Sequence, residues 1–323
     1  MLGGTAFLSR AVAVEAAARG HEVSVAARGA SGPVPDGVRH VVLDRTEEIP
    51  ADLAAQVFDA VVDVARTPSW VARAVAAWPR AHWTFVSTIN VYADETTPGG
   101  TPATLPLVDP QPEDVDLGRH PEAYGPMKVA CEQLVRDGAA RAFVVRPGLI
   151  VGPGDPTGRF TYWPARLADV EPGEPVLAGG DPSDTVQVID VRDLAAWIVT
   201  AAETGLTGDL DGVGPATALG DLLAEASAAL GAEPRWTWAS DAVLEVHDVA
   251  PWMGPRSLPL WLPRPAYDGM LAHDWSPSRD AGLAARPIAE TARDTLEWLR
   301  ATPDAVVTGL TREQEREVLD SLA

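Results

Sequence analysis

Short apolar segments alternate with helical segments through the first half of the sequence, and this alternation constrains the fold more than any other feature. Val23 and Val25 mark one apolar segment, and an alanine-rich helix that starts at Phe7 precedes it. The predicted strands are residues 22–27, 39–43, 59–64, 82–87 and 141–145, and the predicted helices are residues 7–19, 69–78 and 122–138. Strands this short and apolar are typical of a parallel sheet that helices cover on both faces. The sequence therefore predicts an α/β fold with a doubly wound parallel sheet.

A glycine turn stands between the first strand and the first helix. Gly3 and Gly4 follow Leu2, while Ala6 and Ser9 occupy positions where a full glycine motif has glycine. In such a turn the backbone N–H groups of the helix start face a pyrophosphate, and the helix dipole favours its charge. The alternative is an ordinary strand-to-helix turn. We expect a Rossmann-type dinucleotide site here, with cofactor contacts from Gly3, Thr5, Ala6, Phe7 and Leu8.

The pattern changes after residue 152, where proline, glycine and tryptophan become frequent and strands become short and isolated. We expect residues 1–155 to form the dinucleotide-binding domain, with residues 185–203 returning to it. Residues 156–184 and 204–323 are expected to form a smaller C-terminal substrate domain. Its predicted helices are residues 219–230, 289–300 and 312–322.

The end of the second predicted strand bears on the choice of cofactor. An acidic residue there would bind the ribose 2′-hydroxyl of NAD, but this chain has Ala27 and Arg28. A guanidinium can bind a 2′-phosphate bidentately, so we expect NADP(H) to be preferred and NAD(H) to remain possible. The alternative for Arg28 is a solvated turn residue. Asp44, which ends the third strand, either borders the adenine or caps the next helix.

Tyr124 and Lys128 form the most specific pair in the sequence. They are four residues apart, so on a helix they share a face, and Lys128 is the only lysine among the 25 lysines and arginines. An ammonium beside a tyrosine lowers the pKa of the phenol and makes it a better acid–base group at neutral pH. The alternative is a partly buried tyrosine with an exposed lysine. We expect Lys128→Arg to impair the site while leaving folding nearly unaffected.

An apolar strand ends in two hydroxyl residues, Ser87 and Thr88. The carboxyl end of a strand in a doubly wound sheet is where ligands bind, so a hydroxyl there can hydrogen-bond a substrate oxygen beside the tyrosine. A polar cap on the strand end is the alternative.

Together these segments resemble the extended short-chain dehydrogenase/reductase family, the group of NAD-dependent epimerases and dehydratases. The resemblance runs from Gly-Gly-Thr-x-Phe-Leu through Ser-Thr-x-x-Val-Tyr, Tyr-x-x-x-Lys and Arg-Pro-Gly-x-x-x-Gly-Pro to the stretch Ile189–Asp193. It implies that Thr88, Tyr124 and Lys128 are catalytic. It also implies cofactor contacts from Lys128 and from Val64, Ala65, Pro147 and Gly148.

The resemblance implies an NAD(P)-dependent oxidoreductase that acts at a carbonyl or alcohol carbon of a small polar metabolite, with Tyr124 as acid/base. One alternative is a nucleotide-sugar epimerase of the same family. A dehydratase is disfavoured because Ile89 and Asn90, rather than an acid, follow Thr88. Another alternative is a catalytically idle, cofactor-sensing or scaffold protein, which the altered glycine motif favours and the Thr-Tyr-Lys set opposes.

Arginines and aromatic residues open the expected substrate domain. Such a cluster can grip a polar or anionic substrate, or it can be packing. The candidate substrate residues are Asn90, Arg159, Tyr162, Trp163, Arg166 and Gln187.

Composition excludes several other classes of function. The net charge of −21 repels nucleic acid and anionic membranes, and no apolar run approaches the length of a membrane span. Cys131 is the single cysteine and the six histidines are scattered, so we expect no metal site. The N-terminus shows no secretory signal. The sequence predicts a cytoplasmic protein with a small-molecule substrate, without nucleic-acid or membrane partners, and leaves a homodimer open.

Overall fold

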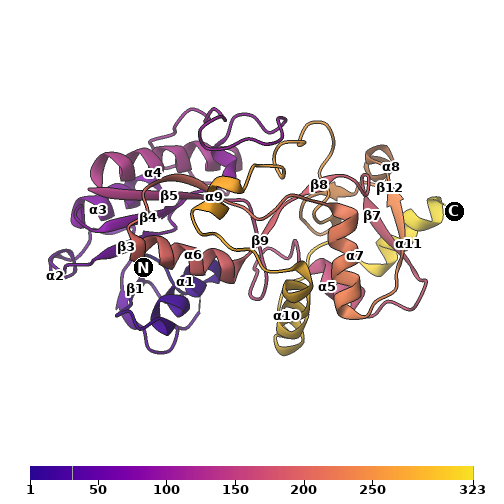
Figure 1. Cartoon of the computed structure of the whole chain (residues 1–323), viewed down its shortest axis with the longest axis horizontal. Coiled ribbons are helices and arrows are strands. Elements are labelled where there is room, and N and C mark those ends of the chain that lie inside the picture. The colour runs from indigo at the N-terminus through magenta and orange to yellow at the C-terminus, as the bar shows by residue number, and fades with distance from the viewer. Residues whose placement is uncertain (31, 323) are drawn as a thin grey trace.

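One parallel sheet forms the centre of the first half of the molecule, seen on the left of Figure 1 in the computed structural model, which describes residues 1–30 and 32–322. Leu2 bridges to Ala26 on one side and to Asp63 on the other, and so joins the two parts of the sheet. Across the sheet, the strands follow the order β2 (Arg39–Val42), β1 (Ser24–Ala27), β3 (Ala60–Asp63), β4 (His82–Val86), β5 (Arg141–Pro147) and β10 (Gly208–Gly212). This arrangement confirms the α/β fold with a doubly wound parallel sheet.

Helices cover both faces of this sheet, as the apolar strands require. On one face α3 (Pro68–Ala77) packs beside α4 (Tyr124–Gly138), and on the other α1 (Phe7–Ala18) packs beside α6 (Val191–Thr204) (Figure 1). Every residue of β4 is buried. Trp83 and Phe85 belong to the core under α3 and α4, whereas Phe143 of β5 packs edge-on against Trp197 of α6 at 5.2 Å between ring centroids.

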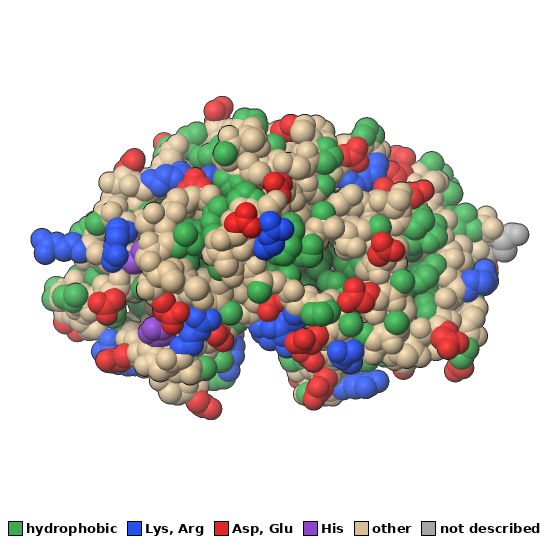
Figure 2. All heavy atoms as spheres, in the orientation of Figure 1, with side chains coloured by type: hydrophobic (Ala, Val, Ile, Leu, Met, Phe, Trp, Pro, Cys, Tyr) green, Lys and Arg blue, Asp and Glu red, His purple; other side chains and the backbone are tan. Residues whose placement is uncertain are grey.

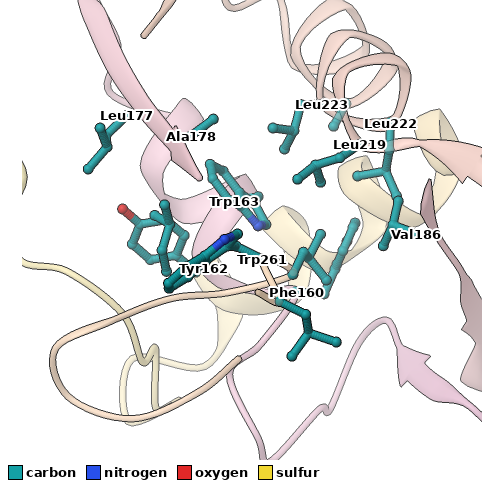
Figure 3. Close-up of a cluster of buried hydrophobic side chains, with 14 of the residues drawn as sticks. Phe160, Tyr162, Trp163, Leu177, Ala178, Val186, Leu219, Leu222, Leu223 and Trp261 are labelled. Carbon is teal, nitrogen blue, oxygen red and sulfur yellow. The ribbon is translucent and has the colours of Figure 1, made fainter. Parts of the chain in front are cut away.

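The second half of the chain builds a separate apolar core around Trp163. Figure 3 shows this side chain between β7 residues and the leucines of α7, with Tyr162 and Phe160 nearby. The elements here are α5 (Tyr162–Leu167), β7 (Pro175–Gly179), β8 (Thr185–Val186), β11 (Thr217–Ala218), α7 (Leu219–Leu230), β12 (Arg235–Ala239), α8 (Asp241–Val246), β13 (Ala250–Pro251), β14 (Ser257–Leu258), α10 (Ile288–Ala301) and α11 (Arg312–Ser321). Strand β7 pairs in parallel with β12, and β8 pairs antiparallel with β11.

Several segments connect the two halves. The parallel pair β6 (Leu149–Val151) and β9 (Val188–Asp190) lies where the chain passes between them, and α9 (Ser276–Asp280) contacts β10. The remaining short elements are α2 (Ala51–Ala54) and the 3₁₀ turns η1 (Ile89–Val91) and η2 (Pro121–Ala123). Figure 2 shows charged side chains of both signs spread over one face, with apolar side chains gathered towards its centre.

The structure differs from the expected organisation at β10. Residues 204–323 were expected in the substrate domain, yet Gly208–Gly212 pairs with β5 at the edge of the central sheet. The segment carries Leu210 as its only large apolar side chain, so it does not show the apolar run by which buried strands are recognised. Helix α6 packs against α1 of the first half, whereas β8, at the start of the stretch that was expected to return with it, pairs with β11.

Within the described part of the chain, no helix combines the length and apolar character that crossing a membrane requires. Residues 1–30 and 32–322 also contain no group of three His, Cys, Asp or Glu side chains placed to hold a metal ion.

Candidate active site

The glycine turn leads from Leu2 into α1 at the carboxyl end of the sheet. Gly4 has a positive φ of 111°, and a Cβ on it would lie 2.6 Å from Val25, so only glycine fits. Phe7, the first residue of α1, has a φ of 32°, which is strained for a residue with a side chain. Backbone strain of this kind is concentrated at ligand sites, and here it lies where a phosphate is expected.

Ser9 explains how the turn persists without a third glycine. Its hydroxyl accepts a hydrogen bond from the Gly4 N–H at 3.0 Å and donates to the Ala6 carbonyl at 2.7 Å. The side chain is buried and braces the turn from inside. The altered motif therefore keeps the shape of a dinucleotide turn.

The residues at this turn fit a dinucleotide pyrophosphate. The Ala6 N-cap has no side-chain hydrogen bond and the first turn of α1 has no acidic residue, so the N–H groups of the helix start meet no side-chain acceptor or negative charge there. Ala6 is exposed, while Gly3, Thr5 and Phe7 are partly exposed. The Leu8 side chain packs into the core under α6, so only its backbone is placed to meet a ligand.

The end of β3 is fixed by a buried ion pair. Asp63 accepts both guanidinium nitrogens of Arg45 at 2.6 and 2.9 Å, and it also accepts the Ala65 N–H at 2.9 Å. These bonds fix the backbone at Val64 and Ala65, the two residues expected beside the cofactor. The Ala65 carbonyl is thereby presented to Lys128.

Lys128 is buried, with 2% of its surface exposed. Its ammonium donates to the carbonyls of Ala65 at 2.7 Å and Val86 at 2.5 Å, and lies 4.2 Å from the centroid of the Phe85 ring. Burial lowers its pKa to about 8, although Asp63 and Glu132 oppose that shift. The expectation that Lys128→Arg would leave folding unaffected assumed an accessible side chain, and the burial corrects it.

Thr88 and Tyr124 come together at the carboxyl end of β4. Burial raises the pKa of the Tyr124 phenol, whereas a hydrogen bond with Thr88 and the charges of Arg66 and Arg159 lower it. The net direction is upward, so the phenol holds its proton at neutral pH and is ready to act as an acid. The tuning of Tyr124 by Lys128 stays a prediction.

Asn90 places Thr88 and also contacts the tyrosine helix. The Thr88 hydroxyl donates to Asn90 Oδ1 at 2.9 Å and accepts the Asn90 N–H at 3.2 Å. A Cβ on Gly125 would overlap the Asn90 carbonyl oxygen, so α4 can approach this turn only through a glycine. Asn90 is exposed beside Thr88 and Tyr124, so its side chain is accessible to a substrate.

Arg159 is the arginine of the second half that faces the site. Its guanidinium lies 4.9 Å from the centroid of the Trp252 ring, and its Nε donates to Thr157 at 3.1 Å. Burial lowers its pKa, while Asp155 and Tyr124 raise it. Arg66, which follows Ala65, also acts on Tyr124, and the sequence reasoning missed it. Its place three residues after the end of β3, next to Ala65, was the available signal.

Four other candidate substrate residues have buried side chains that pack against the rest of the protein. Tyr162 and Trp163 lie in the core of the second half (Figure 3), and the indole of Trp163 donates to the Pro259 carbonyl at 3.1 Å. Arg166 is buried and binds Glu315 at 2.7 Å, within reach of Glu174.

Gln187 binds the Gly214 and His273 carbonyls through its amide nitrogen and the His273 N–H through its oxygen. The polar atoms of Trp163 and Gln187 are thus satisfied within the protein, whereas Tyr162 Oη and Arg166 Nη1 have no hydrogen-bond partner among the described residues. Burial of all four side chains argues against the substrate roles expected of Tyr162, Trp163, Arg166 and Gln187.

Arg28 and Asp44 lie near each other at the ends of β1 and β2. Arg28 is exposed. Asp44 accepts the N–H and hydroxyl of Thr46 at 2.9 and 2.8 Å, and these bonds together with the Arg28 charge lower the pKa of its carboxyl. Asp44 thus forms a local turn and does not cap a helix, since α2 begins at Ala51.

Pro147 ends β5, and the Gly148 N–H donates to the Gly212 carbonyl at 3.3 Å. A Cβ on Gly148 would lie 3.0 Å from Val213, so a side chain at this position would crowd Val213. Both residues are at the same end of the sheet as Thr88, and their contact with a cofactor stays a prediction.

A buried polar network lies behind the site, and the sequence reasoning missed it. Arg146 donates to both oxygens of Glu132 at 3.0 and 2.7 Å and to the Tyr92 hydroxyl at 3.1 Å. The Tyr92 hydroxyl donates to Asp211 at 2.6 Å, and Asp211 contacts His273 Nδ1 at 2.9 Å. The network ties the tyrosine helix α4 to β5, β10 and the segment before α9.

Comparisons with solved structures show the same overall fold. The structure is similar to the Bordetella bronchiseptica enzyme WbmH in complex with NAD+ (TM-score 0.65, 16% identity, covering 93% of this chain and 97% of that one). It is also similar to UDP-N-acetylglucosamine 4-epimerase from Bacillus cereus (TM-score 0.66, 16% identity, 95% and 98% coverage) and to the Thermus thermophilus UDP-glucose 4-epimerase complex with NAD (TM-score 0.62, 18% identity, 93% and 98% coverage).

No curated protein matches the sequence. The model of the NAD-dependent epimerase/dehydratase family matches residues 1–211, which is more than half of the chain. Together with the glycine turn and the Thr88–Tyr124 pair, this match shows that the chain belongs to the NAD-dependent epimerase/dehydratase family.

Proposed function

We propose that this protein is an NAD(P)-dependent oxidoreductase that acts at a carbonyl or alcohol carbon of a small polar metabolite. The observation that carries the proposal is the close packing of α4 against the turn that holds Thr88, through Gly125 and Asn90. This packing supports a Thr88–Tyr124 pair at the carboxyl end of the sheet. A dinucleotide bound at the Gly3–Leu8 turn would supply the hydride chemistry. The chain would supply placement and proton transfer.

Each residue of the site has a defined task in this proposal. Tyr124 gives a proton to, or takes one from, the substrate oxygen, and Thr88 orients that oxygen through its hydroxyl. Lys128 and the fixed Ala65 backbone hold the ribose end of the dinucleotide. Arg159 brings positive charge beside Tyr124, which favours a substrate with a carboxylate or phosphate group.

A nucleotide-sugar epimerase is the second candidate. Two of the similar structures are named as epimerases of UDP sugars, and this chain covers 95% and 93% of its own length in those comparisons. An epimerase returns its substrate at the same oxidation level, so it shows no net formation of reduced dinucleotide. Incubation with UDP-glucose and UDP-N-acetylglucosamine, followed by NMR of the sugar, separates the two candidates.

We further propose that NADP(H) binds more tightly than NAD(H), because Arg28 is exposed at the end of β1 and Ala27 offers no carboxylate. A cytoplasmic location and a homodimer stay predictions. Light scattering of the purified protein measures the second directly.

Removal of the Tyr124 hydroxyl tests the function. We expect Tyr124→Phe to lower turnover of any accepted carbonyl substrate or sugar nucleotide by about 10²-fold or more, the scale of lost acid–base help. Dinucleotide affinity, followed by cofactor fluorescence, should stay within about twofold because the phenol binds the substrate rather than the phosphates. Tyr267→Phe, in the second half, is the matched control. A wild-type protein that binds no dinucleotide would instead support the scaffold alternative.

A further inference from the structure

Arg159 carries an unused guanidinium fork close to Tyr124. Its Cζ lies 4.9 Å from the centroid of the Trp252 ring, and its Nε donates to the Thr157 hydroxyl at 3.1 Å. Within residues 1–30 and 32–322, its two terminal nitrogens form no hydrogen bond or ion pair. The side chain is partly exposed, and its charge acts on the Tyr124 phenol. The fork is therefore available to a ligand that lies beside Tyr124.

The Thr157 hydroxyl is oriented so that it accepts from Arg159. It donates its single proton to Asp155 Oδ1 at 2.6 Å, and the Thr157 N–H donates to the same oxygen at 2.8 Å. Asp155 is buried, so this carboxylate is a fixed point of the turn. The turn thus fixes the Nε edge of the guanidinium and leaves the terminal nitrogens without a protein partner.

The segment between α10 and α11, residues 302–311, binds this turn (Figure 1). We call it the C-terminal strap. The Thr308 hydroxyl donates to the Thr157 carbonyl at 3.2 Å. Gly158 has a positive φ of 72°, and a Cβ on it would lie 2.8 Å from the backbone nitrogen and the hydroxyl of Thr308. The strap and the turn can approach this closely only because position 158 is a glycine.

The C-terminal strap also binds the segment that carries Trp252. The Gly309 N–H donates to the Gly254 carbonyl at 3.1 Å. Trp252 has a positive φ of 71°, a strained conformation of the kind that is concentrated at ligand sites. The strap therefore holds both the turn that binds the guanidinium and the segment whose ring stacks on it.

The end of the C-terminal strap is anchored in the core of the second half. Leu310 is buried, and a Cβ on Gly309 would overlap the Tyr162 ring. Helix α11 follows, and its Glu315 accepts a hydrogen bond from Arg166 Nε at 2.7 Å. A strap fixed in this way gives the guanidinium a preformed position, which lowers the entropy cost of binding a ligand.

We propose that Arg159 determines substrate specificity by binding a carboxylate of the substrate, and that Thr308 is a positioning residue that acts on Arg159 through Thr157. The planar fork matches the two coplanar oxygens of a carboxylate, and one positive charge balances one negative charge. The substrate class is then a hydroxy acid or an oxo acid, an inference that rests on the proposed function for the reacting carbon. The strap lies outside residues 1–211, which the family model matches, so family membership does not imply this contact.

Three small probes test the subsite. Hydroxypyruvate carries a carboxylate, dihydroxyacetone is neutral, and dihydroxyacetone phosphate carries a phosphate. Each is titrated by NMR against the full chain in the presence of NADP+. We expect hydroxypyruvate to bind at least about tenfold more tightly than dihydroxyacetone, because it forms a charge-assisted pair with Arg159. Arg159→Gln should abolish this difference and leave the affinity for NADP+ unchanged.

Variants of Thr308 separate positioning from a general effect on the fold. Thr308→Val should weaken hydroxypyruvate binding by about threefold to tenfold, because the turn that fixes the guanidinium loses a hydrogen bond. Binding of dihydroxyacetone, which does not use the charge, should stay the same. Thr308→Ser keeps the hydroxyl and should restore the preference. Thr302→Val is the matched control, since in the described part of the chain the Thr302 hydroxyl makes no hydrogen bond.

Other outcomes would overturn the proposal. Equal binding of hydroxypyruvate and dihydroxyacetone by the wild type would show that there is no carboxylate subsite, and tighter binding of dihydroxyacetone phosphate would assign the fork to phosphate. A preference that survives Thr308→Val would refute the positioning role. Oxidation of NADPH by hydroxypyruvate, recorded in parallel, tests the proposed function separately. Carboxylate-selective binding without turnover would support the subsite and count against the oxidoreductase.

Discussion

Burial sets how the Lys128 ammonium responds to pH. Its pKa is lowered from an ordinary 10.5 to about 8, so it loses its proton as the pH rises through about 8. We expect dinucleotide affinity to fall by about tenfold between pH 7 and 9, because the neutral amine is a weaker donor to ribose hydroxyls. The stability effect has the opposite sign. The buried charge destabilises the fold below pH 8, and that cost is relieved as the pH rises from about 8 to 10.5.

Lys128→Arg provides the control for this pH effect. The guanidinium keeps its charge to high pH, so the fall in affinity above pH 8 should vanish. Its larger, planar head must fit beside Phe85 and the Ala65 carbonyl, and we expect a loss of about 1–3 kcal/mol in the free energy of unfolding. Cofactor fluorescence and urea unfolding measure the two effects. A variant that binds like the wild type from pH 7 to 9 would make Lys128 a bystander.

Arg28 is the residue on which the cofactor preference depends. We expect Arg28→Ala to weaken NADP(H) binding by about tenfold and to leave NAD(H) binding unchanged, because a charge-assisted contact to the 2′-phosphate is lost. Arg80→Ala, an exposed arginine before β4, controls for the loss of one positive charge. Titration of NADP(H) and of NAD(H) against the wild type, Arg28→Ala and Arg80→Ala measures these affinities. Tighter binding of NAD(H) by the wild type would refute the role given to Arg28.

At the scale of elements, the contact between α4 and the η1 turn sets the distance from Tyr124 to Thr88. We expect Gly125→Ala to cost about 1–3 kcal/mol and to lower turnover, because its Cβ meets the Asn90 carbonyl and pushes the helix away. Gly118→Ala, in the exposed loop before η2, should leave both quantities unchanged. Thermal unfolding and turnover of the two variants test the contact. A stable, fully active Gly125→Ala protein would show that α4 tolerates the shift.

The elements that sequence predicted well are those with both an apolar pattern and a clear end. Helix α7 begins and ends at the predicted residues, and Gly231 in the left-handed region stops it. Strand β10 was missed because it carries two aspartates where a buried strand usually has apolar side chains. These aspartates bind Tyr92 and Arg136, which lie far away in the sequence. The same limit holds at the site. Local spacing placed Tyr124 and Lys128 on one helix, but it could not show that the Lys128 ammonium binds carbonyls of two other strand ends.

For the whole molecule, the buried network from Glu132 to His273 joins the tyrosine helix to the sheet edge and to the C-terminal half. Glu132 and Arg146 are its charged centre, and both are almost fully buried. Removal of one partner of such a pair leaves the other charge buried and uncompensated, which costs about 3–5 kcal/mol. The two halves of the molecule should therefore loosen together when the pair is broken.

Low pH should break the Glu132–Arg146 ion pair, because it protonates the Glu132 carboxyl. The variant Glu132→Gln removes the same charge at neutral pH. Burial alone would raise the pKa of the Glu132 carboxyl, but the Arg146 hydrogen bonds and charge, with Ser87 and Arg136, hold it below its ordinary value of 4.5. The stability it contributes is thus complete above pH 4.5 and is lost as the pH falls through the lowered pKa. We expect Glu132→Gln to be less stable than the wild type by about 3 kcal/mol at pH 7, with a difference that shrinks below pH 4. Urea unfolding from pH 3 to 7 measures this, and the exposed Glu297→Gln is the control. A difference that stays constant with pH would mean that Glu132 is protonated in the fold and that Arg146 is held by other partners.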